Sequence, residues 1–435
     1  MRFSSLKIWL VTVLLAALVS NAFAQANVDS PYSIFGIGQV RDKSMNVNLG
    51  GMGGIANAMY SGSMINVANP ASYARIDSLA FLFDVGMYFK SSTFSNSNMS
   101  EKSNNASFDY LAMAFGLTPW WKVALGAQPY SSVGYNMIID KIDEQCGHYT
   151  SAFSGKGGLN QAFIGNAFKL GKHFSIGANA TYVFGNTESL TTVYFPDSAY
   201  FISSRRGISN MVSSFMFDYG FLFTGKIASD LNLNIGLTYA QKVRLSGTQT
   251  MFIRSIEGDA TQEIEYVIDT VYYKVDNGSK ITMPQGFGVG VALQKNNRWS
   301  IGADFNWMQW SKFAREGIND PLQDSWNVSL GGEYIPVSTS ISSYFTRMSY
   351  RMGAFYEHTY LNVNGNSINK MGVSFGTSLP LPRSLSKVNV AVELGQCGTK
   401  ASSLIQERYI NLRVGIAVHE MWFMKAPMRY DILVK

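Results

Sequence analysis

The chain of 435 residues carries a formal charge of +6 and has a pI near 9.0. Its Lys and Arg residues are scattered and form no basic run of five or more, so we attribute the excess charge to loops and rims rather than to nucleic-acid binding. After the amino-terminal leader no apolar run reaches 18 residues, which excludes a bundle of membrane-spanning helices.

Residues 1–24 have the features of a secretory signal peptide. Arg2 and Lys7 give a basic start, an apolar run covers 8–19, and Ala22-Phe-Ala24 forms a small-x-small site before Gln25. An uncleaved membrane anchor is the alternative, but the apolar run is short for a membrane helix. We expect cleavage and a mature chain that begins near Gln25.

The segment 25–78 is rich in glycine and lacks usable alternation of apolar and polar residues. It contains Leu49-Gly-Gly-Met-Gly-Gly-Ile-Ala56 and Asn69-Pro-Ala-Ser72. Few of its side chains suit a core of their own, so we expect the segment to fold inside another structure. A phosphate-binding loop is an alternative for the glycines, but no Gly-Lys-Ser/Thr follows. Close approach of the backbone to a surrounding wall explains them better.

From 79 to 424 the chain repeats a strict alternation of apolar residues with polar or small ones. Leu231-Asn-Leu-Asn-Ile-Gly-Leu-Thr-Tyr239 is the clearest example. The repeating segments have about ten to fourteen residues, the length of a tilted membrane-crossing strand. A mean hydropathy of only +0.01 fits this pattern, because alternate residues alone face lipid. We therefore predict an all-β protein, an antiparallel transmembrane β-barrel.

Turn signals set the number of strands. Six short turns alternate with seven long polar stretches, and together they make fourteen strands, an even number with long loops at one end of the barrel. The long stretches are 91–106, 138–158, 186–210, 244–282, 311–324, 358–369 and 398–408. The stretch 244–282 contains strand-like pieces such as Tyr266-Val-Ile-Asp-Thr-Val-Tyr-Tyr273, and if these cross the membrane the count becomes sixteen. We expect the barrel to end at 424 and 425–435 to form a tail.

The two cysteines, Cys146 and Cys397, both fall in turn-rich segments that we place outside the membrane. An oxidising compartment permits a disulfide between them. The two segments are not neighbours in the expected strand order, so their pairing stays open.

Several motifs, in their order along the chain, resemble the FadL/TodX-type long-chain fatty-acid and hydrocarbon transporters of the outer membrane. The glycine-rich 49–56 followed by Asn69-Pro-Ala71 resembles the family's amino-terminal hatch. Strand signatures follow at Met283-Pro-Gln-Gly-Phe-Gly-Val-Gly290, Arg298-Trp-Ser-Ile-Gly-Ala-Asp304, Trp310-Ser-Lys-Phe313, Gly331-Gly-Glu-Tyr334 and Tyr350-Arg-Met-Gly-Ala-Phe355. The family's charged substrate-contact residues have no counterpart that a motif identifies.

The resemblance implies a monomeric fourteen-stranded barrel in the outer membrane of a Gram-negative-type bacterium, plugged by a hatch over 25–78. Its partners would be hydrophobic small molecules, long-chain fatty acids or hydrocarbons, together with outer-membrane lipid. Passage would be passive, through the lumen and a lateral opening. The hatch residues that we expect to contact the wall are Gly50, Gly51, Gly53, Gly54, Asn69, Pro70 and Ala71.

In the family, the lateral opening accompanies an inward kink of the third strand. The third predicted strand here carries Pro129 and Gly134. Proline cannot donate to the strand ladder, so Pro129 marks a bulge or a broken edge. An ordinary proline at the end of a strand is the alternative.

Residues that alternate with the lipid-facing ones are expected to face the lumen. The polar members are Asp84, Asn179, Asp218, Asn234, Asp304, Asn306, Glu393 and Arg413, for which we favour internal polar networks over ligand contact. The apolar members are Leu82, Tyr88, Met216, Leu222, Met308 and Trp310. They are candidates for a ligand path, because each buried methylene is worth about 0.8 kcal/mol. Packing against the hatch is an equally good explanation.

No pattern predicts catalysis, a cofactor or a metal. His419 is expected to face the lumen, but no motif places a nucleophile beside it. The four histidines and two cysteines have no zinc-ligand spacing. Two functions other than transport of hydrophobic compounds remain: a structural or secretion-associated barrel that binds proteins through its long external loops, and a general polar pore.

Overall fold

The computed structural model describes residues 29–41, 46–97, 99–144, 146–195, 200–257, 266–295, 298–336, 343–382, 384–401 and 404–421. The predicted signal peptide 1–24 and tail 425–435 lie outside the described residues, as do 422–424, the predicted end of the last strand.

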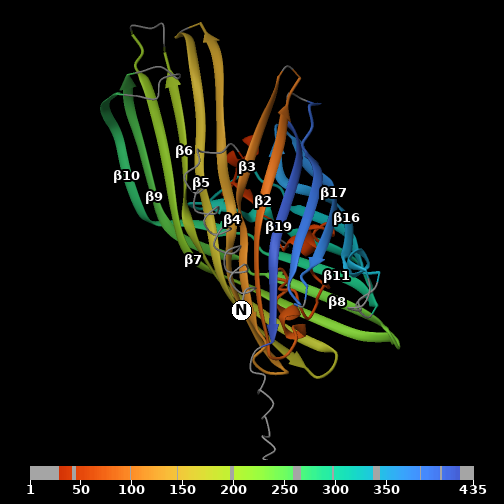
Figure 1. Ribbon diagram of the computed structural model, residues 1–435. Coiled ribbons are helices and arrows are strands. Elements are labelled where there is room, and N and C mark those ends of the chain that lie inside the picture. The colour runs from red at the N-terminus through yellow and green to blue at the C-terminus, as the bar shows by residue number, and fades with distance from the viewer. Residues whose placement is uncertain are drawn as a thin grey trace, which may run out of the picture.

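Fourteen antiparallel strands form a closed ring, which confirms the predicted barrel and its strand number (Figure 1). Each strand pairs with its neighbour in the chain, and β19 pairs with β2 over the whole length of both, closing the ring. The ring strands are β2 (Ala80–Ser95), β3 (Ser100–Phe115), β4 (Trp121–Asp143), β5 (Gly147–Leu170), β6 (Phe174–Tyr194), β7 (Ser203–Ala228), β8 (Leu231–Ala240), β11 (Gly286–Lys295), β12 (Trp299–Met308), β15 (Ser325–Tyr334), β16 (Ser349–Val363), β17 (Asn366–Pro380), β18 (Lys387–Cys397) and β19 (Gln406–Met421).

The apolar positions of the alternation face outward. On β11, for example, Phe287, Val289 and Val291 are exposed on the outer face, while the glycines between them face the lumen. Neighbouring rings in contact form an external aromatic belt in the order Tyr219, Tyr239, Phe287 and Trp307 on four adjacent strands. A second group, Trp120, Trp121 and Phe168, lies at the other end of the barrel, where β4 begins and β5 ends. Such belts mark the two surfaces of the membrane.

The described part of the amino-terminal segment lies inside the ring (Figure 1). It consists of η1 (Pro31–Ile34), β1 (Gln39–Val40), α2 (Val47–Gly50) and η2 (Pro70–Arg75), joined by turns. Leu49, Met52 and Ile55 are buried in a cluster that includes Ala292 of β11. The segment thus obtains its core from the barrel wall.

The height of the wall is uneven, which the sequence did not predict. Strands β4 to β7 have 21 to 26 residues, whereas β8, β11, β12 and β15 have 10 each. Much of the predicted loops 91–106, 138–158 and 186–210 is strand that continues outside the membrane. These stretches show no alternation because water reaches both of their faces.

The strand-like pieces within 244–282 form a hairpin of β9 (Val243–Glu257) and β10 (Tyr266–Met283). The hairpin does not cross the membrane, because β8 and β11 pair with each other along their full lengths beneath it. The alternative of sixteen strands is therefore wrong. Remaining short elements are η3 (Trp310–Lys312), β13 (Ala314–Arg315), β14 (Ile318–Asn319) and α3 (Tyr344–Arg347).

Both cysteines are free, so the disulfide considered between Cys146 and Cys397 is absent. Of the helices that the structure describes, none is long and apolar enough to span a membrane.

Candidate functional site

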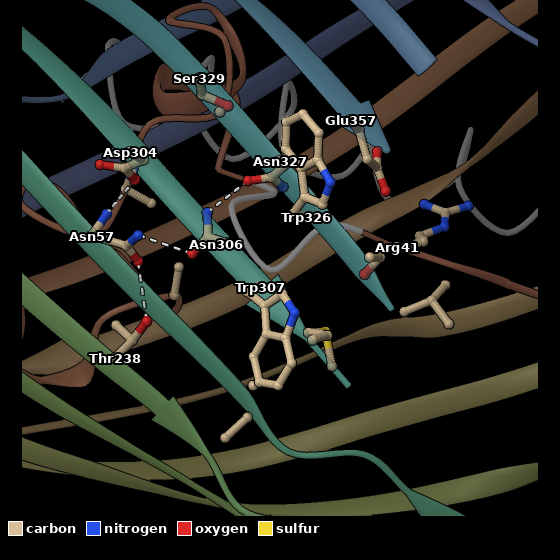
Figure 2. Close-up of a pocket in the computed structure, with 18 of the residues that line it drawn as sticks. Arg41, Asn57, Thr238, Asp304, Asn306, Trp307, Trp326, Asn327, Ser329 and Glu357 are labelled. Carbon is tan, nitrogen blue, oxygen red and sulfur yellow. Dashed lines mark hydrogen bonds between the residues drawn. The ribbon is translucent and has the colours of Figure 1, made fainter. Parts of the chain in front are cut away.

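One lumen-facing carboxylate holds the centre of the amino-terminal segment. Asp304 of β12 accepts hydrogen bonds at Oδ2 from the backbone N–H groups of Ala56 (2.6 Å) and Asn57 (2.7 Å). The Asn57 side chain donates to Asn306 of the same strand (2.9 Å) (Figure 2). These bonds supply partners for backbone groups that have no helix or sheet of their own.

The predicted motif Asn69-Pro-Ala71 forms the start of η2. Asn69 Oδ1 accepts from the N–H of Ala71 (3.1 Å), and Pro70 occupies the first helical position, where no N–H donor is needed. The Asn69 amide also donates to the carbonyl of Phe221 on β7 (3.3 Å). This residue therefore both begins the short helix and ties it to the wall.

Backbone meets backbone where the segment touches the wall. Gly53 has a φ of +71°, and a Cβ there would meet Leu330 O at 2.8 Å and Ala354 N at 2.9 Å. Glycines of the wall strands approach the segment equally closely. The wall glycines are Gly177, Gly220, Gly236, Gly290, Gly331 and Gly353. A Cβ on any of them would clash with a residue of the segment, which is Met52, Gly53, Asn57, Ala58, Asn69, Pro70 or Ala71. Only glycine allows two backbones to approach this closely.

Two cavities remain above the segment. The larger, of about 190 Å³, is bounded by Asn57, Thr238, Asn306 and Asn327 (Figure 2). The buried Tyr130, Tyr360 and Trp310 also line it. The smaller, of about 90 Å³, is lined mainly by charged residues and by Tyr88. The two share the lining residues Val40, Arg41, Glu393 and Arg413.

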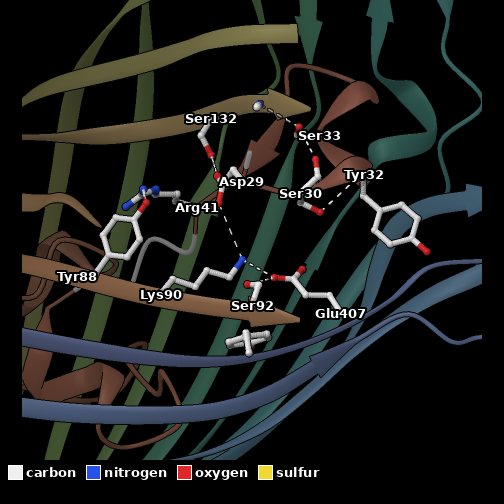
Figure 3. A network of polar contacts seen from close by, with 12 residues as sticks. Asp29, Ser30, Tyr32, Ser33, Arg41, Tyr88, Lys90, Ser92, Ser132 and Glu407 are labelled. Atoms are coloured by element: carbon white, nitrogen blue, oxygen red, sulfur yellow. Dashed lines mark hydrogen bonds and ion pairs between the residues drawn. The ribbon is translucent and has the colours of Figure 1, made fainter. Parts of the chain in front are cut away.

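Paired charges separate the two cavities. Arg41 lies 3.4 Å from Asp109, and Arg413 lies 3.9 Å from the same carboxylate and 3.6 Å from Glu393. A second group joins Lys90 Nζ to Glu407 (2.7 Å) and to Asp29 (4.0 Å) (Figure 3). Each of these basic side chains thus faces a carboxylate, as buried charges require.

The hydrogen-bonded pairing between β3 and β4 is interrupted. Strand β3 pairs with β4 only from Leu111 to Phe115, opposite 123–127, although both strands continue far beyond. Pro129 lies at the bulge that follows on β4, where the register with β5 shifts between Pro129 and Ser131. Above the bulge, β4 leaves β3 and leans with β5 and β6 (Figure 1).

Residues 29–41 cover the edge that β4 exposes on leaving β3. In β1, Gln39 and Val40 pair with Ser132 and Ser131 of β4. Farther along, Gly134 accepts from the N–H of Asp29 (2.9 Å) and donates to Ser33 Oγ (3.1 Å). This part of the segment therefore takes the place of β3 as the partner of β4.

Tyr32 ties the same region to the chain just before β19, on the other side of β2 and β3. Its hydroxyl donates to the carbonyl of Ile405 (2.6 Å), before β19. Burial raises the pKa of this hydroxyl to about 12, so it remains a donor at neutral pH.

Comparison with known proteins places these features in a family. The model of the BamG family matches residues 6–430. The chain belongs to the BamG family. No curated protein matches it in sequence.

Solved structures similar to this BamG-family barrel include toluene transporters and a FadL homologue. The Pseudomonas putida toluene transporter TodX has a TM-score of 0.58 at 15% identity, covering 88% of this chain and 100% of that one. The Ralstonia pickettii toluene transporter TbuX gives 0.58 at 13%, covering 87% and 99%. A Pseudomonas aeruginosa FadL homologue gives 0.53 at 10%, covering 87% and 98%. The resemblance to the FadL type is confirmed, and at these identities it establishes the fold.

The predicted apolar path of the BamG-family barrel does not form one surface. Met308 and Trp310 line the larger cavity, with Trp310 in η3 and stacked on Tyr360 at 4.4 Å. Tyr88 lines the smaller cavity and contacts Arg41. Leu82 is buried in a cluster with the amino-terminal segment. Met216 and Leu222 are buried and line neither cavity.

Four of the eight predicted polar lumen residues of the BamG-family barrel bond to the amino-terminal segment, namely Asp84, Asn179, Asp304 and Asn306. Asp84 accepts from Asn46 (2.7 Å), and Asn179 accepts from Tyr73 (3.2 Å). The sequence analysis missed Arg41 and Asp109, which neither the alternation nor a family motif selects. It also missed Lys90, although this residue continues the phase of Asp84 and Tyr88 along β2. Asn57 was missed as well, since nothing near it in the sequence distinguishes its role.

Replacement of Asp304 by alanine should loosen the segment. Two buried N–H groups would lose their charged acceptor, which costs about 2–3 kcal/mol of unfolding free energy. Urea unfolding of the folded protein in lipid measures this loss. Asp230→Ala is the matched control, because Asp230 makes only an exposed ion pair with Lys295 (3.1 Å) and should change stability by less than about 1 kcal/mol. Equal stability of the two variants would contradict the anchoring role of Asp304.

Proposed function

We propose that this barrel resides in the outer membrane and passes hydrophobic compounds, long-chain fatty acids or hydrocarbons, by passive diffusion. One observation carries the proposal: the break between β3 and β4 lies beside the lumen cavities. The smaller cavity is lined by Asp109 of β3 and Ser132 of β4, the two sides of the break. A molecule in the lumen would thus leave sideways into the outer half of the membrane.

In this proposal the amino-terminal segment acts as the hatch. Its bonds to Asp304 and its close contacts with the wall glycines support a closed route to the periplasm. The lateral route bypasses the part of the hatch that Asp304 holds and passes instead between β3 and residues 29–41, which line the edge of β4. Aromatic and apolar residues such as Trp310 and Tyr130 in the larger cavity supply weak contacts along the way.

The similar structures include two toluene transporters and a monoaromatic hydrocarbon channel. This supports a hydrophobic ligand here. Arg41, Arg413 and Lys90 already face carboxylates, so the charged residues between the cavities offer little to an acidic head group. We therefore expect uncharged compounds to pass at least as well as fatty acids.

The test compares entry of radiolabelled toluene, oleate and a small sugar into liposomes that contain the refolded mature protein. Protein-dependent entry of toluene or oleate without sugar flux is the expected result. Entry of sugar alone would assign the barrel to the polar pores. Entry of none would overturn the transport proposal and leave a closed scaffold.

Filling the larger cavity should block transport. Ala240 lines this cavity at the end of β8, and Ala240→Trp should lower toluene entry about tenfold by occupying the space that the ligand needs. Ala303→Trp is the matched control, because Ala303 is exposed on the outer face of β12. Toluene should enter liposomes with Ala303→Trp as fast as those with the unchanged protein. If both variants transport normally, the cavity is not part of the route.

A second candidate function is a barrel that binds proteins at the cell surface. It is favoured by the hairpin of β9 and β10, which rises beyond the ring and exposes many apolar side chains. A channel needs no such extension. The two functions are compatible within one molecule.

A further inference from the structure

Strand β10 has a free edge. Its one long partner is β9, and on the other side it pairs with β13 only at Ile281 and Thr282. Next to this contact, the carbonyl of Lys280 accepts from the N–H of Glu316 (3.0 Å), and the N–H of Lys280 donates to Glu316 Oε1 (3.1 Å). Among the described strands none pairs with this side from Tyr266 to Ser279. The edge arises because β12 ends at Met308, whereas the line of β11 continues outward as β10 (Figure 1).

The free stretch is apolar on both faces. Seven large apolar or aromatic side chains between 266 and 275 are exposed by 41% or more: Tyr266, Val267, Ile268, Val271, Tyr272, Tyr273 and Val275. Sheets normally protect a free edge by covering it or by making it charged and short. An edge of this composition is instead suited to accept a further strand, through main-chain hydrogen bonds and alternate side-chain contacts.

Lipid does not cover this edge. Through β9, Asp276 is level with Asn210 of β7. Asn210 lies nine residues beyond Tyr219 of the external aromatic belt and five beyond Phe215, the outermost exposed aromatic residue of β7. It is therefore roughly 10–15 Å above the apolar band for a tilted strand. The apolar side chains therefore stand in water unless a protein covers them.

A second copy of the chain fits poorly. Two barrels in one membrane, related by a twofold axis along the membrane normal, would set their β10 edges parallel. Each residue would then face its own copy, so that Lys274 would oppose Lys274 and Asp276 would oppose Asp276. Like charges directly opposite each other destabilise a strand pair.

The register indicates where a partner strand would lie. Bulges interrupt β10 between Val267 and Asp269 and again between Thr270 and Tyr272. From Tyr272 to Asp276 the pairing with β9 is regular. Bulges restrict indiscriminate pairing, which leaves these five residues as the straight part of the edge.

We propose that the edge of β10 at 272–276 binds an extended strand of a different cell-surface polypeptide, with an acidic residue opposite Lys274 and apolar residues opposite Tyr273 and Val275. This inference deepens the second proposed function and does not depend on transport. It specifies main-chain pairing as the mode of binding. Lys274 and Asp276 fix the register and exclude wrong partners.

The test uses the full chain in living cells. A photo-crosslinking amino acid replaces Tyr272, Tyr273 or Val275 in turn, and mass spectrometry identifies the attached residues. The expected products carry one partner segment, with attachment points that move along it in step with the position on β10. Scattered attachment points, attachment to lipid, or attachment to a second copy of this chain would each overturn the proposal.

A charge variant supplies the second measurement. Lys274→Glu should reduce crosslinking from Tyr272 at least about tenfold, because like charges would then face each other. Met211→Glu is the control: Met211 is 60% exposed on β7, which has neighbours on both sides, and its change should leave crosslinking unaltered. Unchanged crosslinking in Lys274→Glu would contradict the assigned register.

A crosslinker at Tyr200, which is 93% exposed between β6 and β7, separates two kinds of failure. Protein attached at Tyr200 but not at β10 would retain a protein-binding barrel and refute the β10 edge as its site. If no protein is attached at either position, the protein-binding function and the β10 edge as its site are both refuted.

Discussion

Valine at Gly236 and Gly331 is expected to prevent the amino-terminal segment from seating. A Cβ at Gly236 would overlap the carbonyl of Asn57, and one at Gly331 would overlap the carbonyl of Met52. Backbone atoms held on both sides cannot move aside as a flexible side chain can. Each substitution should therefore cost about 1–3 kcal/mol, and the two together roughly the sum, because the sites lie on different strands.

Two measurements read out this effect. Limited proteolysis should cut within 46–79 in the double variant and spare this segment in the unchanged protein. The temperature at which the folded barrel unfolds in detergent should fall as well. Gly278→Val is the control, since a Cβ there meets only the Asp276 side chain, at 3.4 Å. If the double variant resists proteolysis to the same degree as Gly278→Val, the wall glycines are not needed for the segment to seat.

The barrel could be predicted because its cause is local and periodic. Alternation along Leu231–Ala240 or Gly286–Lys295 reports directly which side faces lipid, and the turns between strands give the count. The same signal vanishes where strands leave the membrane. Tyr266–Met283 is strand, yet its exposure to water on both faces removes the alternation that would have revealed it as an extension.

The site was only half predictable, for a related reason. The phase of a strand places Asp304 and Asn306 in the lumen, but no local pattern names their partners. Ala56 lies 248 residues away from Asp304 in the sequence. Likewise Pro129 signals a disturbed strand, whereas the replacement of β3 by β1 as its neighbour depends on the whole fold.

Replacement of Arg413 by methionine should be among the most destabilising single changes in the lumen. Asp109 is almost fully buried, with 2% of its side chain exposed, and Arg413 is one of its two cationic neighbours. Glu393 would also lose its guanidinium partner, retaining the hydroxyl of Tyr409 at 2.8 Å. Breaking a buried ion pair from one side costs about 3–5 kcal/mol, which unfolding in urea would reveal.

The double variant Arg413→Met with Asp109→Asn decides what this group of charges is for. If the charges serve to hold the wall and the segment together, removing the Asp109 carboxylate as well should recover part of the lost stability, because a buried anion that has lost Arg413 is then neutral. Arg41 also loses its partner Asp109 in this variant but keeps the hydroxyl of Tyr88. Oleate and toluene entry should then recover together. If Arg413 instead binds an acidic head group, the stable double variant would pass toluene and not oleate. That outcome would reverse our expectation for ligand charge, because it would require Arg413 to exchange Asp109 for the carboxylate of the ligand.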